Sequence, residues 1–150
     1  MRSNISTGNC GEYFVAAELE RRGFSVAVPM SNTPIFDLLA IERENLSNQI
    51  ALQVKTTSKS KNDWAMSPKN EIDLGENVFY VFVKLNGLEE PHYYIVPSSI
   101  VAKQISEGHR RWLETPGRNG QRHNDSKMRK FIIPKNNDYK DAWDLLYKKK

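Results

Sequence analysis

Two short apolar runs, separated by a polar segment, constrain this chain more than any other part of its sequence. The runs cover residues 35–41 and 50–54, and the segment between them, 42–49, is typical of a β-hairpin loop. Each run places apolar side chains on both faces of a strand, so we expect both strands to be covered on both sides. The sequence therefore predicts a hairpin inside a sheet rather than at a wet edge.

Three polar side chains interrupt these strands at one end of the predicted hairpin. Asp37 lies near the start of the first strand, and Gln53 and Lys55 lie near the end of the second. An antiparallel hairpin brings these ends together, and the two-residue period puts Gln53 and Lys55 on one face, with Asp37 across from them in a favourable register. Because such groups are costly to bury, the pattern indicates either a functional site or a buried ion pair between Asp37 and Lys55, hydrogen-bonded to Gln53.

A helix is predicted before the hairpin. Asn9 is a plausible N-cap with Glu12 three residues later, which is a capping-box pattern, and Gly23 ends the helix. Glu12 shares a helix face with Ala16 and Leu19, and so points toward the sheet. Two roles therefore stay open for Glu12, a reciprocal cap and a site residue.

The order of these residues resembles the PD-(D/E)XK nuclease superfamily. Asp37 is followed after fifteen residues by Gln53-Val54-Lys55, and the helix carrying Glu12 comes first; the sequence through Thr56 is similar to the branch whose motif reads Q-V-K-T. The similarity covers about a third of the chain, residues 8–57. It implies an α/β fold with a restriction-endonuclease-like core, in which helices flank a central mixed β-sheet. An extra hairpin and a C-terminal helix would complete a single domain over residues 1–150.

The resemblance also implies a chemistry, the hydrolysis of phosphodiester bonds in DNA by a divalent-metal-dependent endonuclease. Mg²⁺ or Mn²⁺ would be held by Asp37, Gln53, the Val54 carbonyl and Glu12, and Lys55 would orient the attacking water and stabilise developing charge. The chain departs from the family pattern in two ways. Pro34 comes three residues before Asp37, and the neutral Gln53 replaces the usual acid.

Two other functions stay open on the sequence. One is a non-catalytic nucleic-acid-binding protein on the same fold, favoured by the neutral amide of Gln53. The other is a protein-interaction module that binds an acidic partner through a basic loop. If the chain does cut both strands of a duplex, two sites are needed, which makes a homodimer plausible.

Charge is distributed unevenly along the 150 residues. The net charge is +4, but from Arg110 onward 12 Lys and Arg stand against 5 Asp and Glu, a balance of +7 beside −3 for the rest. A basic block suits a polyanionic partner such as nucleic acid. The single cysteine, Cys10, the lack of a signal-peptide pattern and the lack of a long apolar run lead us to expect a cytoplasmic protein with no membrane segment.

Several residues outside the hairpin are predicted to contact nucleic acid. They have hydroxyl groups or positive charges in polar segments, which suits phosphate binding: Thr56, Thr57, Lys59, Lys61, Arg118, Arg122, Lys127 and Arg129. Residues 56–77 have no clear period and are expected to be functional or mobile, with Trp64 covering the core. Residues 123–125 (His-Asn-Asp) are interpreted as residues of a turn rather than as a second metal site.

The remaining elements are predicted from apolar patterns and from the Gly, Pro and Ser residues that begin or end them. Strands are predicted at residues 24–28, 78–85, 92–97 and 131–134, with an Asn86-Gly87 turn between the second and third. A helix from Ser98 or Ser99 is expected to end before Gly108. The terminal helix, 139–147, is expected to bury Trp143 with Leu146 and Tyr147.

Overall fold

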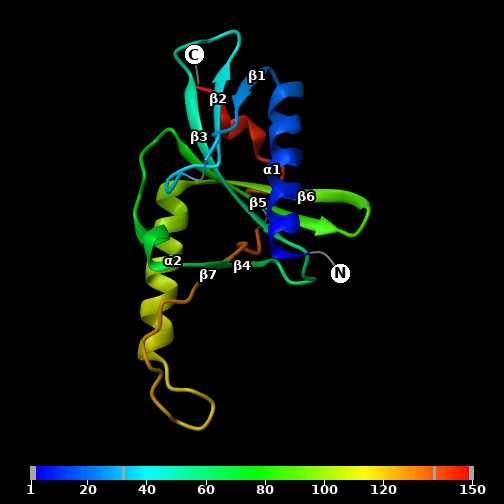
Figure 1. Cartoon of the computed structure of the whole chain (residues 1–150). Coiled ribbons are helices and arrows are strands. Elements are labelled where there is room, and N and C mark those ends of the chain that lie inside the picture. Colours follow the sequence, from blue (N-terminus) through cyan, green and yellow to red (C-terminus); the bar gives the residue numbers. More distant parts are fainter. Residues whose placement is uncertain (1–2, 32, 137, 149–150) are drawn as a thin grey trace.

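The computed structural model describes residues 3–31, 33–136 and 138–148. Its elements are α1 (Asn4–Arg21), β1 (Phe24–Ala27), β2 (Leu38–Glu42), β3 (Gln49–Thr57), β4 (Asp63–Met66), the 3-10 turn η1 (Pro68–Glu71), β5 (Val78–Asn86), β6 (Glu89–Pro97), α2 (Ser98–Glu114), β7 (Arg129–Ile132) and the 3-10 turn η2 (Trp143–Leu146). Figure 1 shows these elements along the chain.

Five strands form the main sheet in the order β1-β2-β3-β5-β6. The β3–β5 pair is parallel and the other pairs are antiparallel, so the sheet is mixed. The predicted hairpin is confirmed as β2–β3, with Leu38 opposite Leu52, and it lies inside the sheet between β1 and β5. A second, two-stranded sheet joins β4 to β7.

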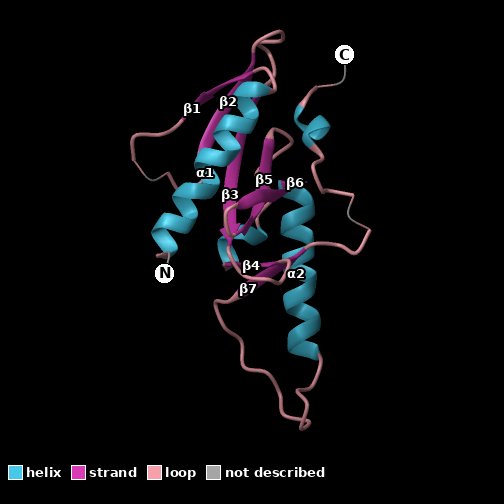
Figure 2. Cartoon of the chain, turned by 90° about the vertical axis from the view of Figure 1, so that its right-hand side faces the viewer, coloured by secondary structure: helices cyan, strands magenta, loops and turns pink. Residues whose placement is uncertain are grey.

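Both faces of the main sheet carry a hydrophobic core, but the predicted covering of both faces of the hairpin holds only for β3. In β2 that prediction was wrong, because the second core cluster does not reach this strand and Leu39 and Ile41 are 40% and 38% exposed. On one face, Val15 and Leu19 of α1 pack on Leu52 and Val54 of β3. On the other face, Tyr80 and Phe82 of β5 join a cluster that is completed by β4, β7 and α2. Figure 2 shows α1 and α2 on opposite sides of the strands.

Helix α1 begins earlier than the sequence predicts. Its N-cap is Ser3, whose hydroxyl accepts a hydrogen bond from the Ser6 amide at 3.1 Å, so Asn9 and Glu12 lie inside the helix. The predicted capping box was therefore wrong, because an earlier serine satisfies the free amides of the first turn. Gly23, at φ +94°, ends the helix as expected. The carboxylate of Glu12 is thus not used as a cap.

Helix α2 continues past Gly108 to Glu114, so the predicted end at Gly108 was wrong. Gly108 takes up no left-handed conformation, and the helix ends where Thr115 precedes Pro116, a position that disfavours helical backbone. The two basic residues Arg110 and Arg111 therefore belong to the helix rather than to the loop.

The predicted C-terminal helix is only the single turn η2. Before it, the chain runs beside β6, where the Ile95 amide donates to the Tyr139 carbonyl at 2.9 Å. Asp141 then takes a positive φ of 50°, which interrupts helical geometry. The predicted burial of Trp143 and Leu146 is confirmed, whereas Tyr147 is only half-buried.

The segment that the sequence left without structure contains β4 and η1. Trp64 in β4 is 2% exposed, and its indole N–H donates to the Val83 carbonyl at 3.2 Å, which confirms its predicted role in the core. The partner strand β7 begins two residues before the predicted strand 131–134. Within the described ranges, no helix combines the length and hydrophobicity that a membrane crossing needs.

Candidate active site

Asp37 lies where β2 separates from β3. Its amide donates to the Leu52 carbonyl at 2.8 Å, and its Oδ2 accepts a hydrogen bond from the Val54 amide at 2.7 Å. The β2–β3 register would place Phe36 opposite Val54, but the Phe36 carbonyl accepts the hydroxyl of Thr33 instead. The Asp37 carboxylate thus replaces a main-chain acceptor at the point where the ladder opens.

Gln53 is buried one residue before Val54, with 6% of its surface exposed. Its Nε2 faces the Pro34 carbonyl at 3.5 Å, in the segment that leads to Asp37. Its Oε1 is buried and has no hydrogen-bond partner among the described residues. Because buried polar atoms are nearly always paired in folded proteins, this oxygen is a candidate ligand atom.

Lys55 follows Gln53 on the same face of β3 and is partly buried. Burial lowers the pKa of Lys55, the Asp37 carboxylate opposes this effect, and the ammonium of Lys69 in η1 adds to the lowering. A partly desolvated amine, close enough to a carboxylate and a second amine to respond to both, is typical of functional sites.

Glu12 reaches the site from α1. With Asp37 it lines a small polar pocket of about 110 Å³, whose other walls are formed by residues 28–31, Thr33 and Phe36. Burial raises the pKa of Glu12 above its ordinary value, and the neighbouring Asp37 carboxylate raises it further. Two carboxylates that repel one another in a partly buried pocket favour a cation.

We tested whether these residues suit a divalent metal. Within the described part of the chain, no cluster of three or more His, Cys, Asp or Glu side chains could hold one. The candidate set is instead two carboxylates, Glu12 and Asp37, with the orphaned amide oxygen of Gln53. The Val54 carbonyl shares an edge of β3 with its own amide, which faces Asp37. All four donors are hard oxygens, as Mg²⁺ prefers, so the residues fit the ion.

The two threonines after Lys55 are packed inside the protein. The Thr56 hydroxyl oxygen is buried without a partner in the described chain and lies against Gly11 of α1. Thr57 is 8% exposed, and its hydroxyl accepts from the Lys59 amide at 3.2 Å. Of this predicted group, Lys59 and Lys61 have exposed side chains on the connection to β4.

The four basic residues predicted near the C-terminus also include both exposed and buried side chains. Arg118, Arg122 and Lys127 are exposed in the loop between α2 and β7. The side chain of Arg129 is only 9% exposed, forms an ion pair with Glu71 and donates to the Ser126 carbonyl at 2.6 Å. Arg129 is therefore not exposed for DNA contact as predicted. Its side chain instead holds the loop against the body of the protein.

Two further residues near the site, Asn70 and Tyr80, have contacts that the sequence did not indicate. Tyr80 lies opposite Gln53 in the β3–β5 register, and its hydroxyl accepts from Asn70 Nδ2 at 3.0 Å. Burial raises the pKa of Tyr80. The only signal in the sequence was that Tyr80 lies in a strand; nothing local indicated that η1 packs against it.

The chain was then compared with known proteins. The structure of a bacterial homing endonuclease, I-Ssp6803I, is similar over 97% of this chain and 92% of that chain, with a TM-score of 0.58 and 15% identity. The Holliday junction resolvase Hjc of the hyperthermophilic archaeon Archaeoglobus fulgidus matches over 83% of both chains, with a TM-score of 0.47 and 14% identity. No protein-family model and no curated protein matches the sequence.

The likeness to the homing endonuclease confirms the predicted fold class. The chain has a restriction-endonuclease-like α/β fold, and its described residues form a five-stranded mixed sheet and two α-helices. Membership of the Q-V-K-T branch stays a prediction, as do the roles of the individual site residues.

Proposed function

We propose that the protein is a divalent-metal-dependent endonuclease that hydrolyses phosphodiester bonds of DNA. One observation carries the proposal: where β2 leaves β3, the Asp37 carboxylate accepts from the Val54 amide, and Gln53, the residue before Val54, has a buried side-chain oxygen with no hydrogen-bond partner among the described residues. A nuclease-like fold supports the same conclusion.

Each residue has a defined task in this proposal. Asp37, Gln53, Glu12 and the Val54 carbonyl hold Mg²⁺ or Mn²⁺, which when bound activates a water molecule and stabilises the leaving oxygen. Lys55 orients the water and stabilises negative charge on the phosphate by hydrogen bonding. The Asp37 carboxylate favours the charged form of Lys55 against the effect of burial.

The basic surface supports nucleic acid as the substrate. Arg118, Arg122 and Lys127 are exposed and form no ion pair within the described residues. Such charges attract phosphates over long range and release counterions on contact. We propose DNA because a protein with a similar structure over nearly the whole chain is a homing endonuclease. Cutting both strands would require two sites, so a homodimer is part of the proposal.

A non-catalytic DNA-binding protein is the second candidate. The observation in its favour is Gln53, because a neutral amide leaves only two carboxylates for the metal. Such a protein would bind DNA through the same basic surface and would not need a metal. A module for an acidic protein partner would share that surface too, but would not explain the anchored Asp37.

Incubation of the purified protein with supercoiled plasmid or single-stranded DNA, in Mg²⁺, Mn²⁺ or EDTA, separates these candidates. An endonuclease nicks or cuts DNA only with metal, and Asp37→Asn does not. Metal-independent cutting that persists in Asp37→Asn contradicts the proposed site. Tight DNA binding with no cutting in any metal supports the non-catalytic protein.

A further inference from the structure

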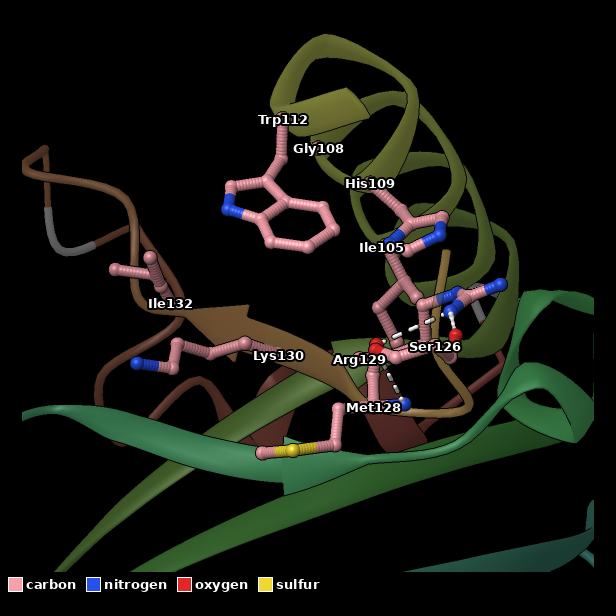
Figure 3. Close-up of a pocket in the computed structure, with 9 residues that line it drawn as sticks. All are labelled: Ile105, Gly108, His109, Trp112, Ser126, Met128, Arg129, Lys130 and Ile132. Atoms are coloured by element: carbon pink, nitrogen blue, oxygen red, sulfur yellow. Dashed lines mark hydrogen bonds between the residues drawn. The ribbon is translucent and has the colours of Figure 1, made fainter. Parts of the chain in front are cut away.

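A groove of about 410 Å³ lies on the opposite side of the sheet from α1, and it shares no residue with the pocket of Glu12 and Asp37. One wall is the C-terminal half of α2, with Ile105 and Trp112, and the other is the segment that carries Met128, Lys130 and Ile132. In Figure 3 the Trp112 ring points from the helix toward this second wall. The proposed hydrolysis does not use the groove.

The two walls of the groove are fastened to one another at both ends. At one end, Gln104 Nε2 donates to the Ile132 carbonyl at 2.7 Å, and the Ile132 amide donates to Gln104 Oε1 at 3.4 Å. At the other end, His109 Nε2 and Asp125 Oδ1 are 2.8 Å apart. The groove is therefore formed before any ligand arrives, which reduces the entropy cost of binding.

The walls offer a flat aromatic and apolar surface. Trp112 is 40% exposed, in contrast to Trp64 and Trp143, which are 2% and 3% exposed. Met128 is 75% exposed. The Trp112 ring stacks with that of His123, with centroids 4.2 Å apart and an interplanar angle of 22°, and at a longer distance with that of His109, at 5.7 Å and 26°. Exposed apolar side chains gathered in a groove mark a binding site, and a supported indole suits a planar ligand.

Positive charge surrounds this surface. Arg111, Arg118, Arg122 and Lys127 are exposed on α2 and the loop after it, and none forms an ion pair in the described part of the chain. Lys130 lines the groove itself and lies 3.4 Å from Asp63. Figures 1 and 2 both show the second half of α2 and its loop projecting from the body as an arm.

A ligand that is both planar and anionic fits these features, and a nucleotide with an unstacked base is one. In a duplex the faces of the bases are covered by their neighbours, so only an unpaired base can stack on a side chain. We propose that the groove binds an unpaired base, and that the substrate of the proposed endonuclease is DNA with unpaired nucleotides beside a duplex. The second part rests on the proposed nuclease function; the binding of the base does not.

The test compares two oligonucleotides of equal length and equal phosphate number, an oligothymidylate and one whose internal sugars are abasic. Wild-type protein should bind the first at least about fivefold more tightly, since each stacked base contributes a factor of that size or more. Met128→Glu places a carboxylate in the groove and should abolish the ratio. Leu88→Glu, at a residue that is 97% exposed in the β5–β6 turn, should keep it.

Equal affinity of the wild-type protein for both oligonucleotides would overturn the proposal, and so would an unchanged ratio in Met128→Glu. The cleavage assay is read separately. Metal-dependent cutting without discrimination between the oligonucleotides leaves the nuclease standing and removes the groove as a base site. Discrimination that Met128→Glu abolishes, without cutting in any metal, keeps the base site and removes the nuclease.

Discussion

The Val54 amide donates to Oδ2 of Asp37 at 2.7 Å, and this bond joins the fold of the hairpin to the proposed chemistry. It follows directly after the main-chain pairing of β2 and β3 has ended, and it fixes the Asp37 carboxylate at the residue that comes after Gln53 in β3. The same side chain therefore has a structural task and, in our proposal, a metal-binding task. Substitutions at Asp37 can separate the two.

Asp37→Asn keeps an oxygen that can accept from Val54 but removes the charge, whereas Asp37→Ala removes both. We expect Asp37→Ala to lose about 1–3 kcal/mol of unfolding free energy, because the Val54 amide is left unpaired, and Asp37→Asn to lose much less. Both should lose the increase in melting temperature that excess Mg²⁺ gives the wild type. Thermal and urea unfolding measure these effects. Equal stability of the two variants would show that the hydrogen bond has no structural role.

Gly11 is required by a close contact between α1 and β3. A Cβ built on Gly11 would lie 1.8 Å from the Thr56 hydroxyl oxygen, whereas a Cβ on Gly8 of the same helix meets nothing within 4 Å. Gly11→Ala should therefore reduce the unfolding free energy by about 1–3 kcal/mol. Gly8→Ala, the matched control, should raise it by up to about 1 kcal/mol through helix propensity.

Urea unfolding of the single variants and of Gly11→Ala combined with Thr56→Ala checks this contact. The double variant should recover part of the loss, because the clashing hydroxyl is gone. A Gly11→Ala protein as stable as Gly8→Ala would contradict the packing of α1 on β3.

The parts of the fold that depend on local sequence patterns could be predicted from the sequence. The hairpin β2–β3 and the strands β5 and β6 have apolar runs and turn residues that specify them directly, and the two-residue period puts Gln53 and Lys55 on one face. The order of helix, hairpin and motif then indicated the nuclease-like fold.

What the sequence did not show depends on contacts between distant residues. Arg129 was grouped with the loop arginines, but its partner Glu71 is 58 positions away and no local pattern connects them. The burial of Thr56 depends on the approach of Gly11 in α1. Helix ends were misplaced where a second cap or stop residue was available, Ser3 in place of Asn9 and Pro116 in place of Gly108.

Asp73 connects η1 to the start of α2 and should contribute to stability in a pH-dependent way. Its Oδ1 accepts from the Gly75 amide at 3.0 Å and from the Ser98 hydroxyl at 2.9 Å, and these bonds, that of Gly75 first, lower the pKa of Asp73. A carboxyl group whose pKa is lower in the folded state stabilises the protein above its unfolded pKa, and this contribution is lost as the pH falls through the folded pKa.

Asp73→Asn should therefore lower the melting temperature near neutral pH, and the difference from wild type should shrink in acid. Melting curves recorded from neutral pH down to below the ordinary aspartate range measure it. Asp144→Asn, at an exposed aspartate in η2, serves as the control for the removal of one surface carboxylate. A difference for Asp73→Asn that stays constant across this range would exclude the charge of Asp73 as the cause.

The exposed basic residues of the arm should set the salt dependence of DNA binding. Replacing Arg118, Arg122 and Lys127 by Ala should weaken binding and reduce the slope of log K against log salt by up to about one unit per lost phosphate contact. Arg129→Ala should leave that slope unchanged but lower stability, because Glu71 loses its partner. Binding isotherms at several salt concentrations decide this. An unchanged slope in the triple variant would place the DNA surface elsewhere and favour an acidic protein partner.

The central claim is that Asp37, Gln53 and Lys55 form a metal-dependent hydrolytic site. Substitutions at Gln53 and at Lys55 should change its activity in opposite directions. Gln53→Glu adds a negative charge next to Asp37, where the amide oxygen of Gln53 now lacks a partner in the described chain, and should tighten metal binding. Lys55→Ala removes the group that stabilises charge on the phosphate but leaves the basic arm intact.

The most direct measurement is a Mg²⁺ titration of cleavage on one labelled duplex with wild type, Gln53→Glu and Lys55→Ala. We predict that Gln53→Glu cuts at a lower metal concentration than wild type, and that Lys55→Ala binds the duplex but does not cut it. Cleavage by Lys55→Ala at the wild-type rate would contradict the proposed site.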